Sequence, residues 1–451
     1  MHREYPWPEP MDSDLRRIEQ LEMGSAGKWL RAQKADGRTD AAIHLLLALA
    51  SARYVDHHGP FIGHGTFNGG PMLRAASILT RPFRDLALLQ TTAYVIDLLH
   101  HPNYGPYLLM DMAPIAEATV EASSAQLLAS IESGEEPLKA EHRLVGLLKT
   151  DANVHALLTE AALRQFHENE HRLLIVHRAA QLMDDTDGWV WAEPIFRSAV
   201  QYLATRPDVK IPKLQDMPAD VAASEGNPTG IESAVEDLIQ ADYGDEPRLL
   251  HDKAGLPVTE VISLTGSEML GRSRFDAHAV TGIHCVLDLL HNPEISPQVR
   301  ALAIESALLG QRTRRQKEIR SSWRATPQPR PRYRPLGEIR EIASHDDSGL
   351  FAMEAVGGAL LAGVQATDIA RTLMEVALVT AGPFEAIHNV KMLWGQLLET
   401  RRSHYPQLAW RHLAAGARVV ADAAVNNRAD ADAIISMWHS AGLSPSQNHP
   451  R

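Results

Sequence analysis

Residues 275–290 read FDAHAVTGIHCVLDLL, a largely apolar segment that carries two histidines six positions apart. Three other segments resemble it, and the last of them lacks the first histidine. The four stretches are DHHGPFIGH (56–64), NEHRLLIVH (169–177), DAHAVTGIH (276–284) and TAGPFEAIH (380–388). Their final histidines follow one another at intervals of 113, 107 and 104 residues. A recurrence of this kind predicts internal repeats. Aligning GPF of the first and fourth stretches instead shifts their histidines by one place, and both registers stay open.

The sequence around these stretches predicts helices. Apolar residues recur at helical spacing in AAIHLLLALASARYV (41–55), NVHALLTEAALRQF (153–166) and DIARTLMEVALV (368–379). Aromatic residues make up only 6% of the chain, and Ala and Leu dominate the apolar share, a balance that favours helix over sheet. We therefore expect an all-α fold of four tandem helical-bundle repeats, about 105–113 residues each, arranged as one array around shared histidine-bearing helices.

Breaks in the helical pattern indicate where the repeats meet. Residues 209–230 are rich in Pro, Asp and Gly and predict a loop, whereas SSWRATPQPRPRYRPLG (321–337) predicts an extended connector. The expected division is an N-terminal extension (1–38) and four repeats, the third of which ends in the connector. The repeats span residues 39–135, 136–230, 231–337 and 338–451.

Composition excludes several classes of protein. A net charge of −12 argues against a nucleic-acid groove, and the single cysteine, Cys285, excludes an internal disulfide or a cysteine-based metal cluster. No apolar run approaches the length of a membrane span, so no membrane association is expected. The charged, Pro-rich first twenty residues lack the apolar core of a secretory signal. We expect a cytoplasmic protein.

The aligned stretches place similar residues at three positions. The first position is occupied by residues that commonly cap helices, which predicts an N-cap there. In an alternative interpretation, its two aspartates belong to the catalytic site, either as a carboxylate ligand or as a base. The second and third positions are histidine in seven cases out of eight. The first position holds Asp56, Asn169, Asp276 and Thr380; the second holds His58, His171, His278 and Gly382; the third holds His64, His177, His284 and His388.

Seven histidines at equivalent places predict a transition-metal site. Residues six apart on a straight helix lie about 9 Å apart along its axis and on different faces, so they do not reach one ion together. The ligands must therefore come from different repeats that face each other. Imidazoles with an occasional carboxylate suit iron, which we expect, with zinc, copper and haem as alternatives. Iron would leave positions open for dioxygen and a substrate, which favours oxidation of a small, largely apolar molecule over hydrolysis.

A further interpretation concerns the neighbourhood of this site. The glycines of HGTFNGG (64–70) predict room for a substrate beside the first histidine. Two other classes of function stay open, namely a helical scaffold that binds a protein partner and a zinc-dependent hydrolase.

The segments HRAAQLM (177–183), AEPIFRSAVQYLA (192–204) and FDAHAVTGIHCVLDLL (275–290) carry a family resemblance. They resemble the helical region that accompanies Rieske iron–sulfur domains in some bacterial proteins. That resemblance implies an electron-fed oxygenase. Because the chain lacks the cysteines of a Rieske cluster, its electrons would come from a separate electron-transfer protein. In size and in its helical, histidine-rich character the chain also resembles questin oxidase-like proteins of aromatic polyketide pathways.

Overall fold

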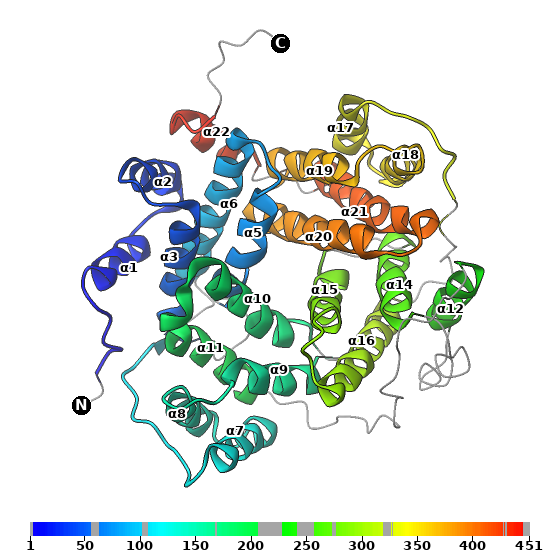
Figure 1. The fold of residues 1–451 in the computed structure, drawn as a ribbon. Coiled ribbons are helices and arrows are strands. Elements are labelled where there is room, and N and C mark those ends of the chain that lie inside the picture. Colours follow the sequence, from blue (N-terminus) through cyan, green and yellow to red (C-terminus); the bar gives the residue numbers. More distant parts are fainter. Residues whose placement is uncertain are drawn as a thin grey trace. The chain divides into compact units, whose positions relative to one another are not determined.

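The computed structural model is built almost wholly of helices, which confirms the all-α prediction (Figure 1). It describes residues 3–55, 63–101, 107–166, 169–205, 228–240, 257–272, 277–318, 326, 328–426, 428 and 431–444. Within these ranges the one sheet is a short antiparallel pair, β1 (Tyr54–Val55) with β2 (Tyr107–Leu108).

The chain divides into two compact units. The first unit comprises residues 1–165, 171–211 and 433–451, and the second comprises 166–170 and 212–432. The first unit thus contains most of the first two predicted repeats, and the second unit contains most of the last two. The finer division into four repeats stays a prediction.

The first unit is organised around α10, whose residues from Arg172 to Met183 are all buried. This helix packs against α4, α5, α9 and α11. The helix therefore buries polar side chains together with its apolar ones, and Arg178, Gln181 and His177 form hydrogen bonds with one another. The helices of the unit are α1 (Met11–Glu19), α2 (Ala26–Ala35), α3 (Asp40–Ala52), α4 (Gly63–Phe67), α5 (Gly69–Ala76), α6 (Arg81–His100), α7 (Val120–Ser133), α8 (Pro137–Leu147), α9 (Val154–Arg164), α10 (His171–Thr186) and α11 (Ala192–Thr205), with 3-10 turns at Met23–Ser25 and Gly188–Trp191.

The predicted N-terminal extension is integrated into this unit. Helix α1 packs on α3 and α6, and α2 packs on α6. The guanidinium of Arg53, at the end of α3, is buried and forms ion pairs with Glu4, Asp12 and Glu19 at 2.6–2.8 Å. Three carboxylates from the first nineteen residues therefore converge on one buried cation and fix the N-terminal segment to α3.

In the second unit, α21 is the central helix. It packs against α14, α17, α18, α19 and α20, and most of its residues between Leu408 and Ala424 are buried. The helices are α12 (Pro228–Gln240), α14 (Val258–Arg272), α15 (His278–Leu290), α16 (Pro297–Glu318), α17 (Leu336–His345), α18 (Leu350–Leu361), α19 (Ala366–Thr380), α20 (Pro383–Arg402) and α21 (Pro406–Asn426). Helix α22 (Ala431–Ser440) follows, and its residues from 433 onward belong to the first unit, where Trp438 packs on Phe83.

Two segments, residues 209–230 and 321–337, were predicted to be non-helical. Residues 328–335 of the Pro/Arg-rich connector form no helix, as predicted, and the amide of Arg332 donates to the carbonyl of Gly358. The loop predicted at 209–230 ends earlier, because α12 already begins at Pro228, a residue favoured in the first helical turn. Residues 209–227 lie outside the described part of the chain.

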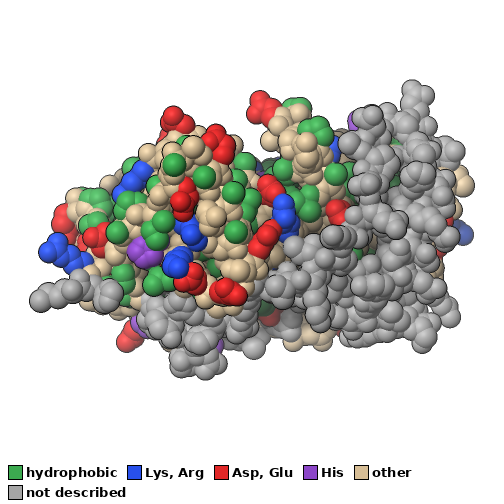
Figure 2. All heavy atoms as spheres, turned by 90° about the horizontal axis from the view of Figure 1, so that it is seen from below, with side chains coloured by type: hydrophobic (Ala, Val, Ile, Leu, Met, Phe, Trp, Pro, Cys, Tyr) green, Lys and Arg blue, Asp and Glu red, His purple; other side chains and the backbone are tan. Residues whose placement is uncertain are grey.

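The surface seen in Figure 2 is mixed in charge. Acidic and basic side chains are interspersed with hydrophobic ones over its described part. Among the helices that the structure describes, none combines the length and the hydropathy needed to cross a membrane.

Candidate functional site

The helices that carry the predicted histidines start later than the sequence suggested. Thr380 was expected to cap the fourth histidine helix, but it is the last residue of α19, and its hydroxyl donates to the carbonyl of Val376. Helix α20 has Gly382 at its N-cap and Pro383 in its first turn. Helix α15 has Ala277 at its N-cap. The capping interpretation is therefore wrong at these two helices, because the Gly-Pro pair and Ala277 occupy the positions assigned to Thr380 and Asp276.

Part of the predicted site lies outside the described residues. This applies to Asp56, His58 and Asp276, and to the side chain of His278, the first residue of α15. Among the predicted site histidines, the structure describes the side chains of His64, His171, His177, His284 and His388.

Two of these histidines, His64 on α4 and His171 on α10, are in direct contact. Their Nε2 atoms are 3.2 Å apart although the residues are 107 positions apart in the chain. His64 is 3% exposed, and its ring packs on Phe67 and meets the ring of Tyr94 edge-on. The contact joins segments that the sequence assigned to different repeats.

The separation of the two Nε2 atoms is compatible with one shared ion. With metal–imidazole bonds of about 2.0–2.1 Å, a nitrogen–nitrogen distance of 3.2 Å corresponds to an angle of roughly 100° at the metal. Angles near this value occur in both tetrahedral and octahedral coordination. The pair therefore has the geometry of two neighbouring ligands.

The protonation state of the two imidazole rings limits what the pair can bind. A neutral imidazole has one N–H and one lone pair, so two facing Nε2 atoms attract each other only when one is protonated or when a cation lies between their lone pairs. The alternative to a bound cation is one Nε2–H···Nε2 hydrogen bond between the two rings. A bound metal would replace that proton, so metal binding at this pair should weaken as the pH falls.

His177 is bonded within its own helix. The guanidinium of Arg178 donates to Oε1 of Gln181 at 2.7 Å, which identifies the other amide atom of Gln181 as the nitrogen. That nitrogen lies 3.1 Å from Nε2 of His177 and donates to it. On the opposite side, the ring of His177 stacks on His155 at 6.3 Å between centroids. These contacts place the ring of His177 beside Gln181 and His155.

In the second unit, the predicted histidines lie on the packed helices α15 and α20. His284 is buried, and its ring lies against Gly395, where any larger residue would overlap it. His388 donates Nδ1–H to the carbonyl of Phe384 in its own helix at 2.6 Å. That bond leaves Nε2 of His388 as the unprotonated nitrogen of the neutral ring, an arrangement typical of ligating histidines and also of buried structural ones.

The glycines after His64 do not leave room for a substrate. A Cβ atom at Gly65 would overlap the hydroxyl of Ser51, and one at Gly70 would lie 2.9 Å from the carbonyl oxygen of Arg178. These glycines let α4 and α5 approach α3 and α10 closely. The prediction of a substrate space at 64–70 is therefore wrong, because neighbouring helices fill it.

Among the residues that the structure describes, no group of three or more His, Cys, Asp or Glu side chains is arranged to hold a metal ion. His64 and His171 are the two predicted histidines whose ring nitrogens the described structure brings into contact.

Sequence reasoning missed a second set of polar groups, centred on Glu399 near the end of α20. Burial raises the pKa of this carboxyl to about 7, against the opposing charge and hydrogen bond of Arg402. Ser263 donates to Glu399 at 3.1 Å, and His291 lies 4.0 Å from it. A carboxyl that titrates near neutrality is suited to proton transfer. The only signal in the sequence is one glutamate in the segment LLETRR (397–402), which a solvated helix end explains equally well.

Comparisons of the chain with protein families, with curated proteins and with solved structures found no match.

Proposed function

We propose that the chain is a metal-dependent oxidoreductase that binds a transition-metal ion, expected to be iron, between His64 and His171. Its substrate would be a small, largely apolar molecule. Dioxygen would be the oxidant, and a separate electron-transfer protein would supply electrons.

The contact between the two Nε2 atoms carries this proposal. The atoms come from α4 and α10, so their approach requires the tertiary fold of the first unit and is not a by-product of helical spacing. Burial of His64 among Phe67 and Tyr94 holds the pair at the edge of an apolar region. Such surroundings strengthen electrostatic interactions with an ion and suit an apolar substrate.

Each side chain has a definite task in this proposal. His64 and His171 present unprotonated Nε2 atoms to the ion, and Phe67 contacts both rings and restricts their rotation. Bound iron would supply redox chemistry and sites for dioxygen.

The test is metal analysis of protein purified without a histidine tag. We expect about one transition-metal ion per chain. Replacing His171 with Gln should weaken binding of added Fe²⁺ by on the order of 100-fold or more, because loss of residues that only orient a ligand already costs 10–100-fold. The variant His345→Gln is the matched control, since His345 lies on α17 with a highly exposed side chain.

Three outcomes would contradict the proposal. Absence of stoichiometric metal would favour a helical scaffold that binds a protein partner. Stoichiometric zinc without consumption of dioxygen would favour a hydrolase. Equal Fe²⁺ affinity of the wild type and of His171→Gln would move the ion away from this pair.

A further inference from the structure

Residues 328–335 form a basic segment on the surface of the second unit. Their sequence, QPRPRYRP, combines three arginines with three prolines and contains no acidic residue. Within this arginine segment Arg330 and Arg332 are exposed, and Tyr333 is 72% exposed. The chain as a whole has a net charge of −12, so the segment is a local exception to its acidic character.

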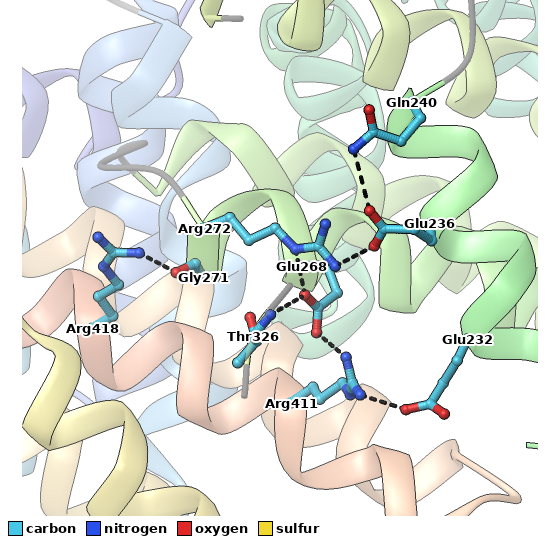
Figure 3. A network of polar contacts seen from close by, with 9 residues as sticks. All are labelled: Glu232, Glu236, Gln240, Glu268, Gly271, Arg272, Thr326, Arg411 and Arg418. Atoms are coloured by element: carbon cyan, nitrogen blue, oxygen red, sulfur yellow. Dashed lines mark hydrogen bonds and ion pairs between the residues drawn. The ribbon is translucent and has the colours of Figure 1, made fainter. Parts of the chain in front are cut away.

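The exposed arginines of this segment differ from arginines in the interior of the same unit. Figure 3 shows Arg272 and Arg411 with Glu268 between them, and both donate to its carboxyl group. Arg330 and Arg332, in contrast, form no ion pair with the part of the chain that the structure describes. Their guanidinium groups are therefore accessible to another molecule.

The backbone of the arginine segment is fixed to α18. Pro329 is buried, and its ring lies 2.7 Å from the position that a Cβ atom at Gly357 would take. The amide of Arg332 donates to the carbonyl of Gly358 at 2.9 Å. Because these contacts and the prolines already restrict the segment, it loses little conformational entropy when it binds a partner.

Helix α18 continues from this contact into an exposed face. Leu350 and Phe351 are 49% and 69% exposed, and Asp347 and Glu354 are exposed beside them. Residues three and four apart lie on the same side of a helix, so Phe351, Glu354 and Gly358 share one face. Phe351 and Gly358 are about 10 Å apart along the helix axis. The arginine segment therefore crosses α18 next to its exposed apolar residues.

This surface has two complementary halves. One half carries the guanidinium groups of Arg330 and Arg332, and the other carries the carboxyl groups of Asp347 and Glu354. Within the described ranges, neither of these carboxyl groups forms an ion pair. A two-fold rotation about an axis between the halves places each half opposite the complementary half of a second molecule. A surface that complements itself in this way gives a closed dimer.

We propose that the arginine segment and the exposed face of α18 bind the same surface of a second copy of this chain. Guanidinium groups of one copy pair with carboxyl groups of the other, and Tyr333 packs against Leu350 and Phe351 of the other copy. The two-fold axis forms each contact twice. One helix face and one short segment make a small interface, so the dimer dissociates on dilution. This proposal does not depend on a bound metal.

Sedimentation velocity of the full-length chain at increasing concentration tests the proposal. The wild type should pass from monomer to dimer. The segment variant, Arg330→Glu with Arg332→Glu, places like charges opposite each other and should weaken dimerisation at least about tenfold. The face variant, Asp347→Arg with Glu354→Arg, should weaken it to a similar extent. All four side chains are exposed, and circular dichroism checks that both variants are folded.

A mixture of the two variants identifies the interface. In the mixed dimer the acidic segment of one variant faces the basic face of the other, and the second contact keeps its original charges. The equimolar mixture should therefore dimerise within about threefold of the wild type, although neither variant does so alone.

The matched control is Arg17→Glu with Lys28→Glu, which changes the net charge equally at exposed positions on α1 and α2. It should dimerise like the wild type. A monomeric wild type would overturn the proposal and leave the arginine segment to a different acidic partner. The proposal would also fail if the segment variant dimerised like the wild type, if the control lost dimerisation equally, or if the mixture stayed monomeric.

Discussion

At the scale of single residues, Glu399 shows how burial sets the chemistry of a side chain. Its carboxyl is almost completely enclosed, and burial raises its pKa to about 7 in spite of Arg402. Asp288 pairs with the same guanidinium, so the positive charge is shared between two carboxylates. His291 and Ser263 are its other polar neighbours.

The raised pKa predicts that Glu399 destabilises the fold as the pH increases. The unfolded carboxyl loses its proton near pH 4.5, whereas the folded one keeps it to about pH 7. Stability from the protonated form is thus fully present below pH 4.5 and is lost as the pH rises through 7. Glu399→Gln should remove about 3 kcal/mol of this decline between pH 4.5 and 8, measured by urea unfolding.

A suitable control for that measurement is Glu354→Gln, which changes an exposed glutamate on α18. Its stability should follow the pH in the same way as that of the wild type. If Glu399→Gln also retained the full pH dependence of the wild type, the carboxyl of Glu399 would not be the titrating group.

The sequence predicted only part of the candidate site. A spacing that recurs along the chain singled out His64 and His171. The polar set around Glu399 left no such trace, because Ser263 lies on α14 and Glu399 on α20, and the spacing of polar residues along one helix says nothing about a second.

At the scale of helices, the histidine-bearing elements pair within each unit. Helix α10 packs on α4 and α5 in the first unit, and α15 packs on α20 in the second. Glycine permits the close approach in both cases, at Gly70 against α10 and at Gly395 against His284. Periodicity predicted these helices correctly. It did not predict their first residues, because a start depends on local capping and on proline as much as on the apolar pattern.

Gly395→Ala should destabilise the second unit by about 1–3 kcal/mol, because the added Cβ overlaps the ring of His284 and forces α15 and α20 apart. In the background His284→Ala the same change should be neutral or stabilising, since alanine is the better helix former. Urea unfolding of the four proteins of this double-mutant cycle measures the coupling.

The control is Gly337→Ala on α17, where a Cβ atom would meet nothing within 4 Å. That variant should gain up to about 1 kcal/mol from helix propensity alone. A cost of Gly395→Ala that persisted unchanged without His284 would show that the two helices are not spaced by this contact.

At the scale of the whole molecule, each unit buries a histidine that burial keeps neutral. Burial lowers the pKa of His44 in the first unit to about 4 and that of His412 in the second unit to about 3. The net charge and the apolar share of the sequence predict none of this, because they do not reveal which of the 22 histidines are enclosed. The chain divides into two compact units, and the finer division into four repeats stays a prediction.

These two histidines predict that the protein opens in acid, unit by unit. An unfolded histidine gains its proton below about pH 6.5, which the folded His412 does not accept until about pH 3. The contribution of His412 to stability is therefore fully present above pH 6.5 and is lost below it by up to about 1.4 kcal/mol per pH unit. Asparagine at 412 keeps a polar atom near Ser267, which lies 2.7 Å from Nδ1 of His412, but does not titrate. His412→Asn should thus reduce the acid dependence of the second unit by one proton.

Amide hydrogen exchange between pH 6.5 and 4.5, corrected for the intrinsic exchange rate, resolves the two units. In His412→Asn, protection of α14, α20 and α21 should decline less steeply with acid than in the wild type, even if lost packing lowers it at every pH. Helix α3, which carries His44, should keep its acid dependence and serves as the internal reference. His345→Asn, at an exposed position, should leave both units unchanged. An equal acid dependence of α14, α20 and α21 in His412→Asn and the wild type would mean that another group controls opening of the second unit.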